Sequence, residues 1–417
     1  MRREDLKNQP FLGSQIVVVV FLTLMGAFGL NLAGGQFFTP LTQTYNWDLT
    51  TLSLAVALNM LVWGIFQPVV GWLIDQFEPK PLLTGSTTLM GVAFLLSATI
   101  TQVWQFCVYY GVLTAIGFAG CSSMVNSVLV SKWYVRRRTK MLARSSMGIN
   151  FGQLVLLPLT GFLIKGTGFR TAFAVLGLIM LLVIVPAIVF GVKSTPGEVG
   201  QGPDGDRSPS SVISRARSVS LSRALRNKDF WFASLGFVSC GYSLYLVTIH
   251  LPMYAFELGG GTALGGQLLG IAAATSAVSM WLTGQLAQNR RKKDLLVPLY
   301  LIRAAAFAWL AVSTSTGELY IFAVVYGLSS FPIIPLVTGI IGNRFGVSTM
   351  GTILGSTLLL HQIFAAIGVF LGGYLRSVTG DYYLAFWTCA VLLVIGAVVT
   401  FFVNEQRPGS QKRAVQT

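Results

Sequence analysis

The sequence predicts an all-α membrane protein with twelve transmembrane helices, arranged as two pseudo-symmetric six-helix bundles. Its composition, its span-length apolar segments and the distribution of its basic residues lead to this prediction. Of the 417 residues, 53% are hydrophobic and 10% are charged, whereas a soluble domain carries about 25% charged residues. Because lipid cannot satisfy an open peptide group, the apolar segments must be helices.

Twelve apolar segments alternate with Gly, Pro and charged residues along the chain. About 20 apolar residues suffice for one helix to cross a hydrocarbon core. The first segment follows a basic N-terminus but lacks a small-residue cleavage site, so we predict a span rather than a signal peptide. The predicted spans are 15–39, 50–74, 81–101, 104–131, 141–165, 169–192, 230–255, 262–287, 295–315, 318–342, 350–375 and 381–403.

The basic residues fall almost entirely on one side of this arrangement. An even number of spans places both termini on the same side, and the loops after spans two, four, six and eight are then rich in Lys and Arg. The opposite loops hold only Lys165, Arg170 and Arg376. Because basic residues are retained in the cytoplasm, this side is predicted to be cytoplasmic, in the cell inner (plasma) membrane. The formal net charge of +15 therefore needs no nucleic-acid partner.

The loop after the sixth span divides the chain. Residues 193–229 are rich in Gly, Pro, Ser and Arg and show no apolar periodicity, which is typical of a mobile linker. Its end, SLSRALRNKDFW, is expected to form a short amphipathic helix at the bilayer surface. The sequence thus predicts bundles over 1–192 and 230–417.

The two predicted bundles share short sequence repeats. The stretch from Gly71 to Lys80 (GWLIDQFEPK) matches the stretch from Gly284 to Lys293 (GQLAQNRRKK), 213 positions later. Repeated halves are typical of transporters that bind their substrate near the membrane midplane between the halves.

The first of these stretches resembles the loop motif of the major facilitator superfamily, Gly-x-Leu-Ala-Asp-Arg-x-Gly-Arg-Lys. The matching positions are Gly71, Asp75 and Lys80, while Glu78 stands at the second glycine and Gln288 replaces the aspartate of the second copy. The resemblance covers essentially the whole chain and implies a secondary transporter. It also implies that Asp75 and basic residues make charge contacts that hold the outward-open state.

Three further stretches resemble the monocarboxylate-porter and oxalate/formate-antiporter branch of this superfamily. They are residues 133–138, 224–231 and 250–259. The branch implies transport of a small organic anion, such as a monocarboxylate, by alternating access with a proton or by exchange. Related porters hold the carboxylate with an arginine that lies four residues before the first glycine of the second motif copy. That glycine is Gly284 here, and the arginine position is occupied by Met280. Whether Arg303 or Arg144 replaces that arginine is left open.

An ionisable side chain inside a membrane costs free energy, so its presence in a span suggests a functional role. His361 lies roughly 16 Å into the eleventh span, where it is either a proton or anion site or a neutral link to another helix. His250 and Glu257, at the outer end of the seventh span, form either a proton or gate site or an interfacial pair. Arg144 either guards the inner mouth or binds headgroups. Arg303 either faces the pathway or extends to the cytoplasmic interface.

Amides and hydroxyls near mid-depth are expected to donate convergent hydrogen bonds to a small solute. The alternative is that they only link helices. The predicted substrate-binding residues are Asn31, Asn59, Asn150, Gln153, Tyr242, Tyr245, Ser329, His361 and Gln362.

The leading hypothesis is a transporter of a small organic anion, and the alternative is a transporter or exporter of a larger, less charged metabolite. In the alternative, Met147, Met280 and Phe331 would line an adaptable apolar cavity. A membrane enzyme or a sensor is not favoured, because no catalytic cluster and no signalling domain is evident. No P-loop is present, and the four cysteines lack metal spacing, so we expect neither cofactor nor metal. The expected partners are a small solute, protons and the bilayer, and the expected state is a monomer.

Overall fold

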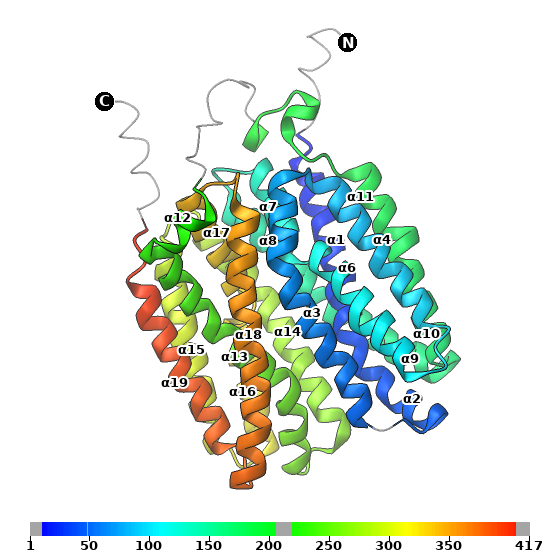
Figure 1. Cartoon of the computed structure of the whole chain (residues 1–417). Coiled ribbons are helices and arrows are strands. Elements are labelled where there is room, and N and C mark those ends of the chain that lie inside the picture. Colours follow the sequence, from blue (N-terminus) through cyan, green and yellow to red (C-terminus); the bar gives the residue numbers. More distant parts are fainter. Residues whose placement is uncertain (1–10, 48, 206–218, 406–417) are drawn as a thin grey trace. The chain divides into compact units, whose positions relative to one another are not determined.

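The computed structural model describes residues 11–47, 49–205 and 219–405, and every element in this part of the chain is helical (Figure 1). The elements before the linker are α1 (Gly13–Leu32), η2 (Ala33–Phe37), α2 (Phe38–Tyr45), α3 (Leu49–Gln76), α4 (Pro79–Ser97), α5 (Val103–Phe106), η3 (Cys107–Leu113), α6 (Thr114–Cys121), α7 (Ser123–Trp133), α8 (Arg138–Phe151), η4 (Gly152–Leu156), α9 (Leu157–Thr167), α10 (Phe169–Ile179), η5 (Met180–Ile184) and α11 (Val185–Gly191). Those from the linker onward are η6 (Pro196–Val199), η7 (Pro203–Gly205), α12 (Leu221–Leu225), α13 (Lys228–Glu257), α14 (Gly261–Leu286), α15 (Lys293–Val312), α16 (Thr316–Ser329), α17 (Ile333–Phe345), α18 (Met350–Thr379) and α19 (Tyr383–Phe401).

The chain forms two compact units. The first unit contains Met1–Val219 and Phe345–Gly355, and the second contains Ser220–Arg344 and Ser356–Thr417. The start of α18 therefore belongs to the first unit and the rest of that helix to the second. The linker joins the two units. In each unit, the end to which the linker is attached is called the linker end.

The predicted all-helical class is confirmed, and each predicted span coincides with one helical segment. The largest difference at a segment end is six residues, where the first span was predicted to stop at 39 and helix α2 continues to Tyr45. Within residues 11–47, 49–205 and 219–405, ten segments are long and apolar enough to cross a membrane. The other two are α4 and α14, in which Gly, Ser and Thr lower the hydropathy. These helices pack inside their own units, α4 against α6 and α14 against α16.

Glycines allow close approach between helices in both units. Gly148 of α8 and Gly152 of η4 face the backbone of α1 at Phe21 and Met25, where an added Cβ would collide with a carbonyl oxygen. The four-residue spacing of this pair is the small-xxx-small pattern that lets two helices approach closely. In the second unit, Gly241 of α13 meets the backbone of α18 in the same way.

Two of the long helical segments are broken near their middle. Between α6 and α7 the backbone of Ser122 is extended, with ψ −171°, and the side-chain amide of Asn126 donates to the carbonyls of Cys121 and Ser122. Between α16 and α17 the helix stops at Ser329 and resumes after Pro332. A proline alone would be expected to bend such a segment, and at Pro332 the structure shows an interruption instead.

The predicted linker is only partly what its composition suggests. Residues 193–205 fold into the turns η6 and η7 and pack on the first unit, so they are not a mobile tether. Residues 206–218 lie outside the described part of the chain. The short helix predicted near the end of the linker is α12, five residues long, and Asn227 then caps α13 through the backbone N–H of Asp229.

Candidate functional site

The most unusual group in the second unit is the guanidinium of Arg303 on α15. Its side chain is 0% exposed, so the interpretation that it extends to the interface is wrong. Nη1 donates to Cys240 Sγ at 3.3 Å and to Ser243 Oγ at 3.2 Å, both on α13. Nη2 donates to the carbonyl oxygen of Ser329, the last residue of α16.

The broken segment explains why this carbonyl is available. The last carbonyls of a helix have no partner within it, and a cation is favoured at that end of the helix dipole. Because α16 ends at Ser329, its terminal carbonyl can accept a hydrogen bond from Arg303 inside the unit. The guanidinium carbon also lies 5.5 Å from the centre of the Tyr326 ring, a cation–π distance.

The charge of Arg303 is not compensated by an acidic side chain among the described residues. All its hydrogen-bond partners are neutral, and the ion pairs found there involve other residues. The buried carboxylates described in the second unit are paired elsewhere, Asp229 with Arg344 at 2.6 Å and Glu405 with Lys292 at 2.9 Å. Burying an ion costs several kcal/mol, and neutral hydrogen bonds offset only part of that cost. An anion would offset more.

Unused donors surround this charge. Arg303 Nε and the hydroxyl of Tyr300, one turn earlier on α15, are buried without a hydrogen-bond partner in the described part of the chain. Tyr300 is not among the residues predicted from the sequence, although its spacing of three residues places it on the Arg303 face of the helix. Together these groups form a buried cationic centre in which two hydrogen-bond donors have no acceptor among the described residues.

His361 of α18 lies beside this centre. Its ring stacks on Phe237 with centroids 4.3 Å apart, and the charge of Arg303 acts on it. Nδ1 is 3.1 Å from Oε1 of Gln362, whereas Nε2 has no partner among the described residues. Gln362 also bonds the hydroxyl of Tyr245, which is half-buried. The structure therefore brings together His361, Gln362 and Tyr245 from the predicted set.

Two other predicted residues of the second unit have their hydroxyls engaged elsewhere. The hydroxyl of Tyr242 is 2.7 Å from Oγ1 of Thr388 on α19. Ser329 donates its own hydroxyl to carbonyls of α16 and contributes to the centre only through its backbone. Both hydroxyls serve the scaffold in this structure.

In the first unit, Asn31 and Asn59 form a closed network with Tyr110. Asn31 Nδ2 donates to Asn59 Oδ1 at 3.0 Å, and Asn59 Nδ2 donates to the Tyr110 carbonyl at 2.8 Å. The Tyr110 hydroxyl returns to the Asn31 carbonyl at 2.6 Å. Tyr110 lies in the π-helical segment η3, whose wider turn alters the backbone hydrogen bonding. Both atoms of the Asn59 amide are thus used within the unit.

Asn150 differs from these residues. It is 0% exposed in α8, and neither atom of its amide has a partner among the described residues. Gln67 of α3, which is not among the residues predicted from the sequence, is likewise 0% exposed, and neither atom of its amide has a partner there. Gln153 is half-buried in the π-helical segment η4, and Arg144 is exposed on α8. Four unused amide atoms on buried side chains are suited to a polar solute or to water.

The loop-motif aspartate contacts a helix end rather than a basic side chain. Asp75 accepts hydrogen bonds from the backbone N–H of Gly351 at 2.8 Å and of Thr352 at 2.7 Å, and from the Thr352 hydroxyl at 2.6 Å. These are the free donors of the first turn of α18, where a carboxylate also meets the positive end of the helix dipole. No ion pair among the described residues includes Lys80, whose backbone N–H bonds Ser194. The charge of Lys132 also acts on the Asp75 carboxylate, so a basic residue takes part as the resemblance implies, without a direct ion pair among the described residues.

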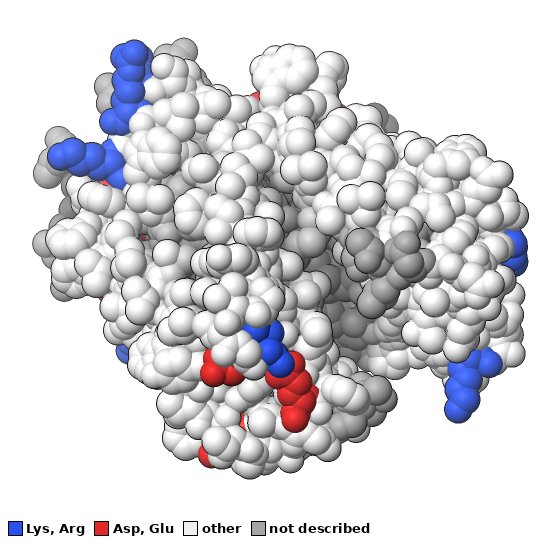
Figure 2. Space-filling view, turned by 60° about the horizontal axis from the view of Figure 1, so that its bottom comes forward, with Lys and Arg blue, Asp and Glu red and all other residues white. Residues whose placement is uncertain are grey.

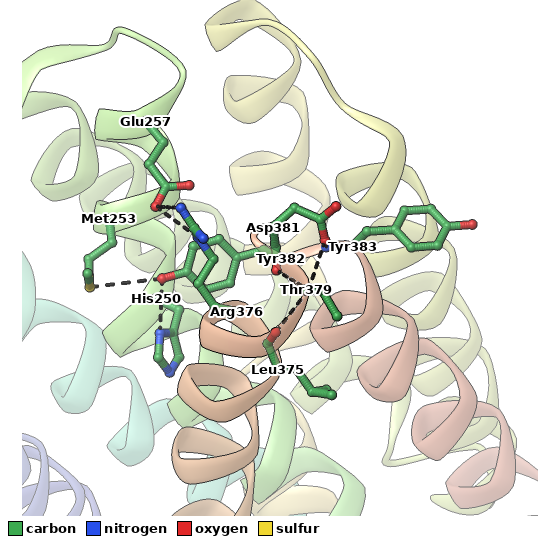
Figure 3. A network of polar contacts seen from close by, with 9 residues as sticks. All are labelled: His250, Met253, Glu257, Leu375, Arg376, Thr379, Asp381, Tyr382 and Tyr383. Carbon is green, nitrogen blue, oxygen red and sulfur yellow. Dashed lines mark hydrogen bonds and ion pairs between the residues drawn. The ribbon is translucent and has the colours of Figure 1, made fainter.

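At the end of the second unit opposite the linker, His250 and Glu257 belong to one network but do not touch (Figure 3). Arg376 pairs with Glu257 at 3.1 Å and lies 5.7 Å from the centre of the Tyr382 ring. His250 Nε2 is 2.9 Å from the carbonyl of Val369 and must carry the proton, because a carbonyl only accepts. Nδ1 is then the acceptor that faces the Tyr382 hydroxyl at 3.4 Å.

The electrostatics of this network keep Tyr382 neutral. Burial and then the Glu257 carboxylate raise the pKa of the Tyr382 hydroxyl, while Arg376 opposes them. The phenol therefore remains a donor, and the acceptors within its reach are His250 Nδ1 at 3.4 Å and Met253 Sδ at 4.0 Å. Apart from this network, most side chains at this end are neither basic nor acidic (Figure 2).

Replacing Glu257 by glutamine is expected to lower the melting temperature of the purified protein only slightly. Both partners of the Arg376 pair are about one-third exposed, and such pairs contribute roughly 0.2–1 kcal/mol. A thermal melt of the detergent-solubilised variant beside wild type measures the change. A loss above roughly 2 kcal/mol would show that the pair does more than exposed pairs do.

Comparisons with known proteins agree with this architecture. The sequence profile of the Major Facilitator Superfamily matches residues 16–369. The "Uncharacterized MFS-type transporter YcxA" of Bacillus subtilis (strain 168) is 23% identical over 411 residues, which cover 93% of this chain and 96% of that protein. "Monocarboxylate transporter 13" of Rattus norvegicus is 22% identical, with 93% and 88% covered. "Monocarboxylate transporter 11" of Homo sapiens is 24% identical, with 89% and 79% covered.

Solved structures show the same fold. The proton:xylose symporter XylE superposes with a TM-score of 0.79 at 15% identity, covering 95% of this chain and 97% of that one. The fucose:proton symporter FucP gives 0.71 at 14% identity, with 95% and 100% covered. The profile match extends over most of the chain, and the apolar helices make it a multi-pass membrane transporter rather than an enzyme. The chain therefore belongs to the major facilitator superfamily.

Proposed function

We propose that this protein is a secondary active transporter of a small organic monoanion, such as a monocarboxylate. It would work by alternating access, with rocking of two six-helix halves over 1–192 and 230–417, coupled to protons or by exchange. The observation that carries the proposal is the fully buried Arg303, whose partners are all neutral. In this role Arg303 replaces the carboxylate-binding arginine that related porters have at the position of Met280.

Charge balance supports a monoanion over a dianion. The second unit holds one buried cation that lacks an acidic partner among the described residues, so one negative charge neutralises it. A second negative charge would remain uncompensated at the same depth, at a cost of several kcal/mol. His361, Gln362 and Tyr245 offer neutral hydrogen-bonding groups to the rest of the solute.

The relatives give independent support for this substrate class. Two of them are named monocarboxylate transporters, from rat and human, and each covers most of this chain. Their identity of 22–24% supports the class of solute and leaves the individual acid to experiment.

We propose that His361 binds the coupling proton once an anion occupies the centre. An anion beside Arg303 would compensate its charge and make an imidazolium less costly nearby. His361→Gln keeps a neutral hydrogen-bonding side chain but cannot titrate, so it is expected to abolish stimulation of uptake by an inward proton gradient. Uptake into proteoliposomes with and without the gradient measures this. An undiminished response to the gradient in His361→Gln would contradict the proposed proton site.

The same preparation separates the anion from the alternative, larger solute. Thermal-shift screening of the purified protein with small carboxylates and with neutral apolar compounds is expected to show stabilisation by carboxylates. Stabilisation by neutral apolar compounds alone would favour a transporter of less charged metabolites.

We propose an inner-membrane location with both termini in the cytoplasm, because the basic clusters lie at the linker end. A cysteine introduced into residues 193–205 should not react with an impermeant thiol reagent added to intact cells. Labelling from outside would reverse the orientation.

A further inference from the structure

Residues 193–205, which we call the strap, are bound to several helices of the first unit. The strap leaves α11 and crosses the linker end of that unit. Its hydrogen bonds to other elements include Trp133 Nε1 to the Lys193 carbonyl at 3.0 Å, the Lys80 N–H to Ser194 Oγ at 3.3 Å and the Leu12 N–H to Gln201 Oε1 at 3.2 Å. The strap thus touches the ends of α7, α4 and α1.

The firmest contact of the strap is made by Asp204. Its carboxylate accepts hydrogen bonds from three consecutive backbone N–H groups, those of Val135 at 3.0 Å, Arg136 at 2.8 Å and Arg137 at 3.4 Å. Successive N–H groups that converge in this way form a concave site for an anion. These residues make the turn between α7 and α8, and the Asp204 side chain is only 6% exposed there.

Charge complements this geometry. Arg136 Nε is 3.9 Å from the Asp204 carboxylate, and the same charge acts on Arg138. Burial and then the Asp204 charge raise the pKa of the neighbouring Tyr134 hydroxyl, so the carboxylate acts electrostatically on this side chain as well. An acidic residue of the strap is therefore held against a turn that carries three consecutive arginines, 136–138.

The strap is shaped to present this carboxylate. Thr195 and Glu198 form a capping box around η6, and Gly200 and Gly205 adopt left-handed conformations that favour glycine. Asp204 itself is left-handed, with φ 60°, which is disfavoured for a residue with a side chain. The contacts of its carboxylate hold it in that conformation.

We propose that the strap is a latch whose Asp204 fixes the turn between α7 and α8, so that the linker end of the first unit moves as one rigid body during transport. The turn connects two helices that a rocking mechanism must move together. Release of Asp204 would leave three N–H groups without their acceptor and would free the helix ends that the strap joins. This inference concerns the rate of the conformational change and does not depend on which solute is carried.

Hydrogen exchange on the full-length protein tests the latch. Asp204→Ala is expected to speed exchange of the amides at 135–137 by roughly ten-fold or more, because those groups lose their acceptor. Asp204→Gly is expected to do the same, since the carboxylate rather than the backbone makes the contact. The matched control is Asp381→Ala, which removes a carboxylate that binds the Tyr383 N–H in the second unit. It should leave 135–137 protected.

Transport provides the second measurement. In Asp204→Ala the maximal uptake rate is expected to fall roughly three-fold or more with KM unchanged, because a looser unit slows the conformational step and leaves binding intact. Unaltered exchange at 135–137 in both Asp204 variants would overturn the latch, as would wild-type uptake in a variant whose amides are exposed. A change in KM alone would assign Asp204 to solute binding instead. Unchanged protection of α13–α19 confirms that the variants are folded.

Discussion

Replacing Arg303 by methionine is expected to abolish uptake of the transported anion. The side chain is 0% exposed and supplies the one buried positive charge of the second unit that has only neutral partners in the described structure. Removing one member of a buried charge pair costs about 2–5 kcal/mol. Since 1.4 kcal/mol is a factor of ten, anion affinity should fall by roughly 30-fold to several thousand-fold. Initial rates of uptake into proteoliposomes measure the loss.

The Arg303→Met variant is nevertheless expected to remain folded. Replacing a buried charge by an apolar side chain of similar volume is often neutral or stabilising. Arg303→Lys keeps the charge but not the fork that reaches Ser243 and Ser329 together, so intermediate uptake is expected. Arg291→Met is the matched control, because the Arg291 side chain is about one-third exposed and pairs with Asp294 at 2.9 Å. If a folded Arg303→Met variant showed wild-type uptake, the role of Arg303 would be limited to capping the end of α16.

Replacing Asp75 by alanine is expected to lower the stability of the first unit by about 3 kcal/mol. The change removes three hydrogen bonds to a carboxylate, each worth about 1.5–3 kcal/mol, and exposure to water offsets part of that loss. It also removes the negative charge from the positive end of α18, worth about 0.3–1 kcal/mol. A thermal melt in detergent, followed by uptake measurements, tests both stability and function.

Two graded variants make the Asp75 result specific. Asp75→Asn keeps one acceptor oxygen but no charge, and Thr352→Val removes only the hydroxyl contact, so each should lose about 1 kcal/mol. Gly71 lies one turn earlier on α3 and meets the backbone of Gly351, so the two helices are already in close contact there. A melting temperature for Asp75→Ala equal to wild type would show that this backbone contact alone positions α18.

The sequence was sufficient to predict the helices because their cause is local. Apolar segments of span length have one structural solution in lipid, and their ends agree with the structure to within six residues. The repeated loop motif likewise identified Gly71 and Asp75, which do meet a second helix. What the motif does not contain is the partner, because Thr352 lies 277 positions away in the chain.

The neighbours that a side chain faces from its helix were less predictable than the helices themselves. Arg303 had two open interpretations, since depth along α15 is readable from the sequence but the facing neighbours are not. The deciding feature is the end of α16 at Ser329, whose carbonyl becomes available only because that segment is interrupted. Pro332 indicated a bend, and three-dimensional packing was needed to place Arg303 against it.

The strap shows the limit of reasoning from composition. Gly, Pro and Ser over 193–205 favour a mobile linker, and the same residues also build tight turns. Which of the two forms depends on Asp204 finding the backbone of Val135, 69 positions away. Such a contact leaves no periodic signal in the sequence.

The central claim, that Arg303 supplies the counter-charge for a monoanion, is tested most directly by equilibrium binding of a transported carboxylate and its uncharged carboxamide. Wild type is expected to prefer the carboxylate by roughly 30-fold or more, a difference of about 2 kcal/mol or above. Arg303→Met is expected to bind the two compounds within roughly three-fold of each other. An unchanged preference for the carboxylate in folded Arg303→Met would place the counter-charge elsewhere and contradict the proposed function.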